Sequence, residues 1–198
     1  MSAETTDIPK MIFRKGPRVI LRPHTESDLE PSCRMINDPR NSRFLTAHCP
    51  FGYADQRDFI LSTQKEGEIL LAIESDGAYI GNMGMRHIDH MHGHAETGSL
   101  IGLPEYQGKG YGTEAKLLLL EYAFNTLGLR KVYSQVFAFN GRSLKYAEKC
   151  GYQEEARLQD HFFAAGEFHD KVILSVDRAR WQPLWDAFYA NHKEEIIS

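Results

Sequence analysis

Glycines gather in one stretch, Leu103-Pro104-Glu105-Tyr106-Gln107-Gly108-Lys109-Gly110-Tyr111-Gly112-Thr113-Glu114-Ala115 (103–115), between an apolar run and a helical pattern. Glycine lets a backbone turn tightly and approach a ligand closely. The N–H groups of residues 108–113 would lack partners within the following helix and would point outward, together with the positive end of its dipole. The stretch therefore predicts a site for a phosphate or pyrophosphate; the alternative is a glycine-rich turn that binds nothing.

Two common nucleotide-binding loops fit this stretch poorly. A Walker A loop needs Gly-Lys followed by Ser or Thr, but Lys109 is followed by Gly110. A dinucleotide-binding loop needs Gly-x-Gly-x-x-Gly in the first strand–helix unit of its domain. Here the third glycine is Gly112, too early for that spacing, and the segment lies in mid-chain.

Outward from the glycines, the hydrophobic patterns predict a mixed α/β domain. Strands are expected at 18–22, 69–74, 79–87, 94–101, 131–137, 152–163 and 167–177. Helices are expected at 25–37, 54–65, 111–123 and 140–150, with a helix-compatible segment from about 182. We expect the sheet to be mostly antiparallel. The strands at 94–101 and 131–137 would be parallel neighbours, joined by an amphipathic crossover helix.

Composition narrows the class of protein. The chain has 198 residues, of which 42% are hydrophobic and 25% charged, as in a single globular domain with its core at about 18–178. A net charge of −4 argues against a broad nucleic-acid or anionic-membrane surface. No secretory signal and no apolar run of about 20 residues is present. Together with three widely spaced cysteines, this predicts a soluble cytoplasmic protein with reduced thiols.

Several motifs in register resemble one family. Gln107-Gly108-Lys109-Gly110-Tyr111-Gly112 is similar to the Gln/Arg-x-x-Gly-x-Gly/Ala loop of the GNAT (Gcn5-related) N-acetyltransferases, which binds the pyrophosphate of acetyl-CoA. Val19 to Pro23 resembles the first strand of the branch that acetylates ribosomal-protein N-termini. The segment from Asn140-Gly141-Arg142-Ser143 to Cys150-Gly151-Tyr152 resembles a helix of that branch. The resemblance covers 18–178 and implies the GNAT fold with acetyl-CoA as cosubstrate.

The resemblance also implies a cofactor site. The strand near 100–103 should splay from its neighbour at 132–137, so that the pantetheine arm enters the gap. The residues expected to bind acetyl-CoA are Ile101, Gly102, Leu103, Gln107, Gly108, Lys109, Gly110, Tyr111, Gly112, Thr113, Asn140, Arg142, Ser143 and Tyr146.

Two residues are expected to act chemically. Glu96 resembles the family's strand carboxylate and would help remove a proton from the acceptor amine. Ser143, on the first turn of a helix, would supply a proton to the leaving thiolate, with Tyr146 as a rival donor. Many family members carry a catalytic Tyr at the position of Ala147, and this departure favours Ser143. The alternatives are that Glu96 is an ordinary surface residue of its strand and that Ser143 only bonds locally to the backbone at the start of its helix. Glu114 is expected to have a structural role.

The acceptor stays open at this stage. A protein N-terminal amine is favoured by the branch resemblance, with a polyamine or another small amine as alternatives, and a non-catalytic acyl-CoA-binding domain as a rival function. Asp160, Glu167 and Asp170, with nearby aromatic residues, could wall an acceptor pocket. Four histidines within residues 87–94 are expected to form a polar turn, so no metal is predicted. A homodimer is expected only from the family.

Overall fold

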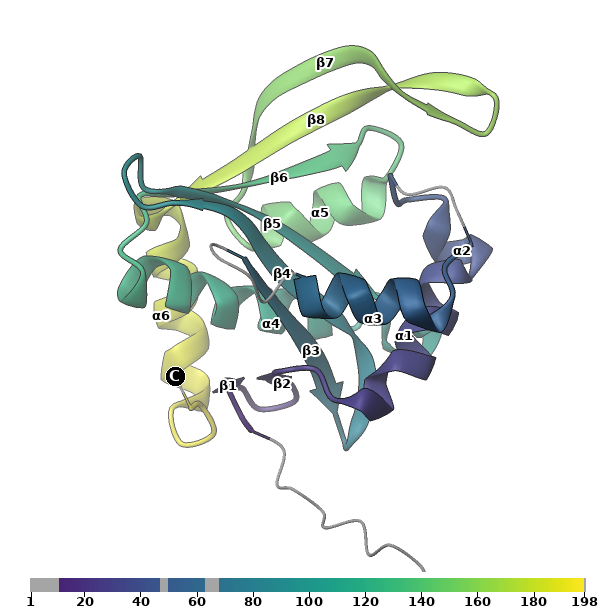
Figure 1. Ribbon diagram of the computed structural model, residues 1–198. Helices are drawn as coiled ribbons and strands as arrows, with labels where there is room; N and C mark the ends of the chain where they lie inside the picture. The colour runs from purple at the N-terminus through teal and green to yellow at the C-terminus, as the bar shows by residue number, and fades with distance from the viewer. Residues whose placement is uncertain (1–10, 47–49, 63–67, 198) are drawn as a thin grey trace, which may run out of the picture.

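The chain forms one eight-stranded sheet with helices on both faces (Figure 1). The structure is a computed structural model that describes residues 11–46, 50–62 and 68–197. The strands are β1 (Arg14–Lys15), β2 (Ile20–Arg22), β3 (Ile69–Ser75), β4 (Ala78–Asp89), β5 (His94–Ile101), β6 (Lys131–Phe137), β7 (Gln153–Ala164) and β8 (Glu167–Asp177). Their order is β1-β2-β3-β4-β5-β6-β8-β7, and every neighbouring pair is antiparallel except β5 and β6. The predicted fold class is confirmed.

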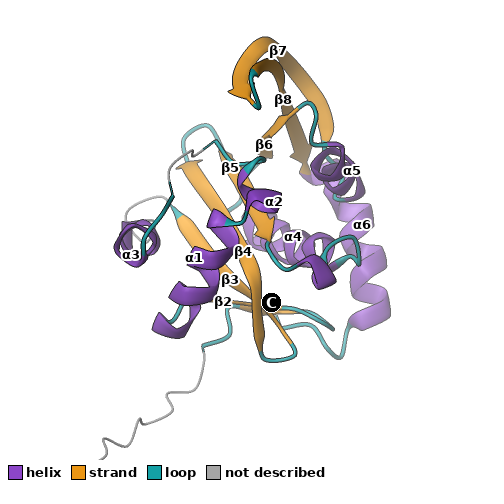
Figure 2. Ribbon diagram, turned by 90° about the vertical axis from the view of Figure 1, so that its right-hand side faces the viewer, coloured by secondary structure: helices purple, strands orange, loops and turns teal. Residues whose placement is uncertain are grey.

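The helices divide into two layers. They are α1 (Leu29–Asn37), α2 (Pro39–Ser42), α3 (Tyr53–Ser62), α4 (Tyr111–Glu121), α5 (Gly141–Lys149) and α6 (Arg178–His192). Short 3-10 turns occupy Glu26–Asp28 and Pro104–Tyr106, and a π turn, Tyr122–Thr126, continues α4. Figure 2 shows α1, α2 and α3 on one side of the sheet and α4, α5 and α6 on the other. The site draws residues from both sides of the sheet.

The parallel pair is short, and this shapes the site. β5 and β6 pair only at His94↔Lys131, Ala95↔Val132 and Glu96↔Tyr133. Beyond Glu96, β5 goes on pairing with β4, while β6 goes on pairing with β8. The two strands therefore separate toward their C-terminal ends, as the family resemblance implies.

The crossover helix α4 is not amphipathic, contrary to the prediction. Ala115, Leu118 and Leu119 are buried as expected, but Leu117 and Leu120 on the other faces are buried too. α4 contacts β1, β5, α5 and α6, so protein surrounds it. The apolar face that the periodicity picked out is only part of a fully enclosed helix.

Other boundaries also differ from the sequence expectation. β1 was not expected, because two residues carry no alternation. The short helix α2 was not expected either: Asp38 accepts a hydrogen bond from the N–H of Arg40 and caps it, and Pro39 is tolerated in its first turn. α6 begins at Arg178 rather than near 182, because Asp177 caps it by accepting from the N–H of Arg180. The expected end of the second helix, at 63–65, lies outside the described residues.

A buried ionic network fixes β2 to β3. The Arg22 guanidinium donates to both carboxylate oxygens of Asp28, at 2.7 and 2.9 Å, and to Glu74 at 2.6 Å. Desolvation raises the pKa of Asp28, but hydrogen bonds from Arg22 and Thr25 outweigh it and lower that pKa overall. Next to this network, both ring nitrogens of His24 are buried without a hydrogen-bond partner among the described residues, and burial lowers its pKa to about 4.

Candidate active site

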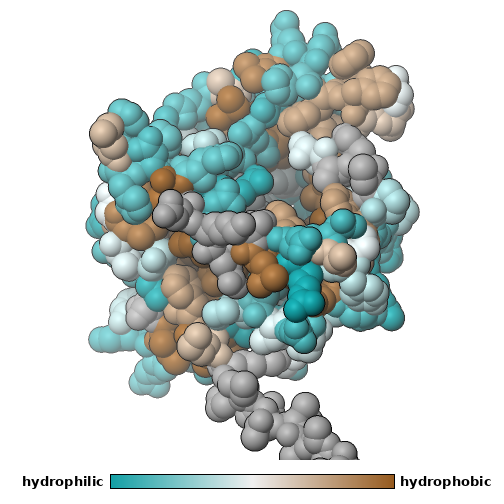
Figure 3. Space-filling model, viewed as in Figure 1, coloured by the Kyte–Doolittle hydropathy of each residue, from teal (hydrophilic) through white to brown (hydrophobic). Residues whose placement is uncertain are grey.

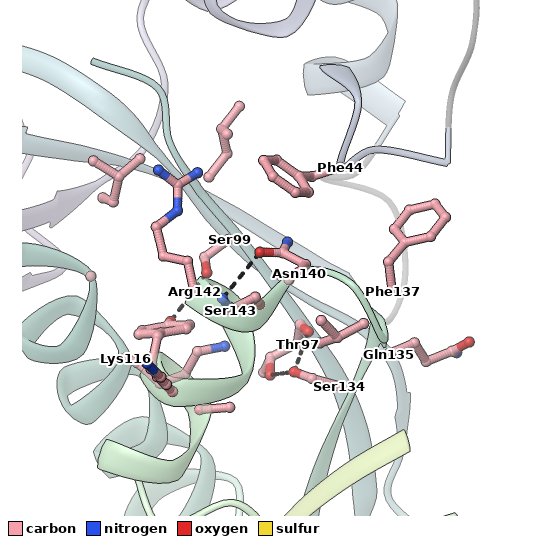
Figure 4. A pocket seen from close by; sticks show the side chains of 18 of the residues that line it. Phe44, Thr97, Ser99, Lys116, Ser134, Gln135, Phe137, Asn140, Arg142 and Ser143 are labelled. Atoms are coloured by element: carbon pink, nitrogen blue, oxygen red, sulfur yellow. Dashed lines mark hydrogen bonds between the residues drawn. The ribbon is translucent and has the colours of Figure 1, made fainter. Parts of the chain in front are cut away.

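A cavity of about 900 Å³ opens where β5 and β6 separate (Figure 4). β5, β6, the glycine loop, the first turn of α4 and α5 supply most of its lining. The residues expected from the sequence that line it are Glu96, Ile101, Gln107, Gly108, Gly110, Gly112, Thr113, Asn140, Arg142, Ser143 and Tyr146. Segments far apart in the sequence thus meet in one cavity.

The other expected cofactor residues lie behind this lining. Gly102 packs on α1, where an added Cβ would lie 2.3 Å from Met35 Sδ. Tyr111 lies under the Arg18 guanidinium, and the Lys109 carbonyl accepts from Arg18 Nη1 at 3.0 Å. Leu103 packs against the hydrophobic core. In this structure Gly102, Leu103 and Tyr111 support the loop from behind, and Lys109, whose side chain is exposed, ties it to Arg18 through its carbonyl.

The glycine loop has the backbone that its sequence requires. Gly108 and Gly110 have φ values of 74° and 92°, in the left-handed region that residues with a Cβ rarely adopt. Gly110 is the N-cap of α4, so the first N–H groups of the helix are left without partners in it. These groups and the helix dipole give the cavity one end suited to phosphate.

Glu114 holds that end to the rest of the domain. Its buried carboxylate accepts from the N–H of Arg18 at 2.8 Å, from the N–H of Val19 at 3.0 Å and from Arg18 Nε at 2.9 Å. The first turn of α4 is thereby tied to the segment that leads into β2. This is the structural role expected for Glu114.

Asn41 is a supporting residue that the sequence did not reveal. Its side-chain amide donates to the carbonyls of Met35 and Gly102, both at 3.0 Å. Gln107 in turn donates to the Ile101 carbonyl at 2.8 Å and contacts Arg142 of α5. Together these bonds link α2, the end of β5, the glycine loop and α5. Only the fold brings Asn41 to this place.

Opposite faces of β5 carry different chemistry, because successive side chains of a strand point to opposite faces. Glu96 is buried and accepts from Gln135 Nε2 at 3.0 Å and from Arg86 Nη2 at 3.3 Å; His87 Nδ1 lies 3.3 Å away. On the other face, Ser99 is hydrogen-bonded to Tyr146 Oη at 3.1 Å. A carboxylate thus approaches the gap from one side and hydroxyl groups from the other.

Hydroxyl groups also mark the point where the strands part. Thr97 Oγ1 lies 2.9 Å from both Ser134 Oγ and Tyr152 Oη, and Ser134 Oγ donates to the Thr97 carbonyl at 2.7 Å. The backbone N–H and C=O of one strand residue point to the same side. Because Thr97 directs its carbonyl toward β6, Ser99, two residues on, presents both of its backbone groups to the open gap.

α5 brings Ser143 and Tyr146 to the cavity. Asn140 is the N-cap and accepts from the Ser143 N–H at 3.1 Å, and Gly151 follows the helix with a φ of 87°. These two residues bound the helix that the sequence predicts at 140–150. Ser143 is half-buried at the cavity wall, and burial raises the pKa of Tyr146 well above its usual value.

Lys116 is a lining residue that no sequence motif indicated. It lies one turn into α4 and is only 2% exposed. Its ammonium nitrogen lies 5.8 Å from the ring centre of Tyr146 and 5.7 Å from that of Tyr152. Burial lowers its pKa to about 8. The only sequence signal was a lysine placed directly before four leucines.

The charges that line the cavity are nearly all positive. Among the described residues, Glu96 is the only lining carboxylate. The lining cations are Arg86, Lys116, Arg142, Lys145, Lys149 and Lys171. The expected acidic wall is not found here, because Asp170 faces Arg157 and the N–H of Asp160, and neither aspartate nor Glu167 lines the cavity.

A second cavity, of about 1200 Å³, adjoins the first and shares Phe44, Thr46 and Phe162 with it. Its described lining includes Phe139 and Phe163 and holds no carboxylate. Figure 3 shows apolar colour over the end of the β7–β8 hairpin, where Phe163 and Phe168 are 56% and 64% exposed. We call this second cavity, with Phe44, Phe139, Phe162 and Phe163 in its lining, the aromatic channel.

The histidine-rich segment spans the end of β4, which holds His87, the turn that follows, and His94 at the start of β5. His92 and His94 stack with ring centres 6.3 Å apart, and His87 faces Glu96. The residues that the structure describes contain no group of three or more His, Cys, Asp or Glu able to hold a metal ion. Cys33 and Cys150 are buried free thiols, and Cys49 lies outside the described residues. Within the described part of the chain, every helix is too short or too polar to cross a membrane.

Comparison with known proteins decides the family. Residues 18–153 match the family described as "Acetyltransferase (GNAT) domain". The chain belongs to the GNAT family. As a GNAT member it is an N-acetyltransferase that depends on acetyl-CoA, and its sheet with the splayed parallel pair is the fold of that family.

Several relatives carry more specific names. Spermidine N(1)-acetyltransferase of Escherichia coli (strain K12) is 28% identical over 159 residues, covering 80% of this chain and 85% of the relative. YdaF of Bacillus subtilis (strain 168), named as a candidate ribosomal N-acetyltransferase, is 32% identical over 107 residues, covering 54% and 58%. The Vibrio cholerae spermidine N-acetyltransferase solved with CoA and spermine superposes with a TM-score of 0.76 at 24% identity, covering 83% of this chain and 98% of that one. The family is thus shared by relatives named for different acceptors.

Proposed function

We propose that this GNAT enzyme acetylates an acceptor with a single amine, the N-terminal amine of a peptide or protein. The observation that carries this proposal is the charge of the cavity: Glu96 is its only described carboxylate, and six cations share the lining with it. One carboxylate can receive one ammonium group. The adjoining aromatic channel would take apolar side chains of the residues that follow the N-terminus.

A polyamine is the second candidate, because the relatives include spermidine N(1)-acetyltransferases. A polyamine carries several positive charges at neutral pH. Past Glu96, its remaining ammonium groups would meet Arg86 and Lys171 rather than carboxylates. Like charges at close range are unfavourable, and more so in a partly desolvated cavity. The lining therefore favours the peptide.

The roles of the chain's residues follow from the two faces of β5. The N–H groups of 108–113 would hold the pyrophosphate of acetyl-CoA, and the backbone of Ser99 would pair with the pantetheine arm in the gap. Glu96 would take the proton of the amine, directly or through water, as the nitrogen attacks the thioester carbonyl. A backbone N–H of β5 would stabilise the oxyanion. Ser143 would donate a hydrogen bond toward the departing sulfur. The amine would attack the thioester directly, in a ternary complex of the enzyme with acetyl-CoA and the acceptor.

The experiment that tests this proposal measures release of free thiol from acetyl-CoA. One group of acceptors consists of peptides with a free N-terminus and an aromatic or aliphatic residue at the second position. The same peptides blocked at the N-terminus are the controls, and spermidine and spermine are tested beside them. We expect turnover with the free peptides, none with the blocked ones, and a kcat/KM for spermidine at least about tenfold lower, equivalent to about 1.4 kcal/mol. A higher kcat/KM for spermidine would overturn the choice of acceptor. Binding of acetyl-CoA without turnover on any amine would favour the acyl-CoA-binding alternative.

Other expectations stay predictions. The cytoplasmic location, the homodimer and the absence of a metal or nucleic-acid partner each need their own measurement. Nothing in the proposed chemistry depends on them.

A further inference from the structure

The ammonium group of Lys116 is a buried charge without a counter-ion. It lies between the rings of Tyr146 and Tyr152, at 5.8 and 5.7 Å from their centres, and no carboxylate of the described residues lies within 4.0 Å of it. Burying an unpaired ammonium is costly, so such a group is retained only where something offsets the cost. Tyrosine faces supply part of that compensation. The arrangement is suited to an anion that is present only part of the time.

The surroundings of Lys116 place it against the strand gap. Tyr146 is hydrogen-bonded to Ser99 and Tyr152 to Thr97, both on the α4–α5 face of β5 and beyond the last residue paired with β6. Lys116 itself lines the cavity and is drawn beside the helix that carries Ser143 in Figure 4. It therefore faces the same gap as Glu96, from the opposite side of the sheet.

The other ionisable groups near Lys116 do not neutralise it. Cys150 approaches it from α5, but burial raises the pKa of that thiol to about 12 and keeps it protonated. Tyr146 and Tyr152 also have raised pKa values. Lys145 and Lys149 of α5 line the same cavity and are positive, while Glu96 is held by Arg86 and Gln135 on the other face.

We propose that Lys116 is the cationic partner of the CoA sulfur, stabilising the thiolate that forms as the thioester breaks. The proposal rests on the proposed acetyl transfer and adds a residue to it. In that step the amine nitrogen forms a bond to the acetyl carbon, and the C–S bond breaks with its electron pair going to sulfur. Lys116 then shares or donates a proton to the sulfur, giving CoA thiol, and regains a proton from solvent. The proton of the amine goes to Glu96.

The chemistry of the two groups matches. A thiol has a pKa of about 8.5, close to the value of about 8 to which burial brings Lys116. An acid of that strength can hold its proton at neutral pH and still pass it to a thiolate. The Ser143 hydroxyl can donate a hydrogen bond but brings no charge, so the two residues would act together.

The test follows the ionisation of bound CoA and needs no acceptor. The ultraviolet absorbance of the thiolate is recorded against pH for CoA bound to the wild type, to Lys116→Met and to Lys145→Met. Lys145 is an exposed lysine of the same cavity and serves as the matched control. The same titration with desulfo-CoA gives the baseline.

We expect the thiol of CoA bound to the wild type and to Lys145→Met to ionise about one pH unit below that of free CoA, a tenfold shift. In Lys116→Met the shift should disappear, while the affinity for desulfo-CoA stays within about threefold of wild type. If the thiol of CoA bound to Lys116→Met still ionised at the lower pH, the proposal would be overturned. It would also be overturned if wild type bound CoA and the thiol ionised at the same pH as in free CoA.

A second readout separates this role from a structural one. With an active acceptor, kcat of Lys116→Met should fall about 10²-fold at neutral pH, with KM for acetyl-CoA little changed. Thermal unfolding should show Lys116→Met at least as stable as wild type, because a buried unpaired charge has been removed. Failure of CoA to bind to any of the proteins would refute the proposed function itself, and this inference with it.

Discussion

Replacement of Glu114 by alanine should destabilise the protein without touching the reacting groups. The buried carboxylate satisfies the N–H groups of Arg18 and Val19, at 2.8 and 3.0 Å. Alanine would leave both donors without a partner. An orphaned buried donor costs about 1–3 kcal/mol, so the loss of partners for two donors should lower the free energy of unfolding by about 2–6 kcal/mol. The ion pair with Arg18 adds little, because that arginine side chain is 47% exposed.

The measurement is thermal and urea unfolding of Glu114→Ala beside Glu148→Ala, a matched control at an exposed position of α5. For a domain of this size, the loss corresponds to a drop in Tm of roughly 4–24 °C. Glu148→Ala should unfold within about 0.5 kcal/mol of wild type. A loss below about 1 kcal/mol in Glu114→Ala would refute the assigned role, since even one orphaned donor should cost that much.

Three further predictions concern the strand gap, the catalytic base and the pH dependence. Gly81→Ala would place a Cβ 1.9 Å from the Leu100 carbonyl oxygen and push β5 away, so the free energy of unfolding in urea should fall by at least about 2 kcal/mol. Gly98→Ala is the control: its Cβ would meet nothing within 4 Å, and this variant should unfold like wild type. Glu96→Gln should lower kcat about 10²-fold at neutral pH and leave the calorimetric affinity for acetyl-CoA unchanged, and an unaltered kcat would exclude Glu96 as the base. Because the folded-state pKa of His24 is lowered from about 6.5 to about 4, the unfolded chain binds its proton first as the pH falls, and stability present above pH 6.5 is lost toward pH 4. That loss should be about 3 kcal/mol by urea unfolding at several pH values and should be missing from His24→Phe; equal pH slopes in the two proteins would contradict the assignment.

Much of this architecture could be predicted from local patterns. β5 and β6 begin and end at the expected residues, and the turn at Asp76-Gly77 follows from two residues in the left-handed region. The glycine loop and the Asn140 cap depend on neighbours only a few positions away. Such features can be predicted from a short stretch of sequence, because the residues that cause them are close neighbours in the chain.

The parts that escaped prediction depend on long-range contacts. Nothing near Asn41 in the sequence indicates that its amide reaches Gly102. Lys116 looks like a solvated lysine until the fold brings Tyr146 and Tyr152 against it. In the same way, α4 looks amphipathic until α6 packs on it. The acidic pair at Asp160 and Asp170 suggested an acceptor wall, yet the register of the β7–β8 hairpin turns Asp170 toward Arg157. Local periodicity carries no information on such partners.

The central claim is that acetyl-CoA binds in the gap between β5 and β6. The most direct measurement is a calorimetric titration of acetyl-CoA into the wild type and into Gly112→Val. An added Cβ at Gly112 would lie at ordinary contact distance, 3.4 Å from Tyr146 and 3.5 Å from Ile101, so the fold should persist while the valine methyls enter the cavity. We predict saturable binding to the wild type and a loss of at least about tenfold in affinity for Gly112→Val at an unchanged Tm. Equal affinity in the two proteins, or no binding to the wild type, would contradict it.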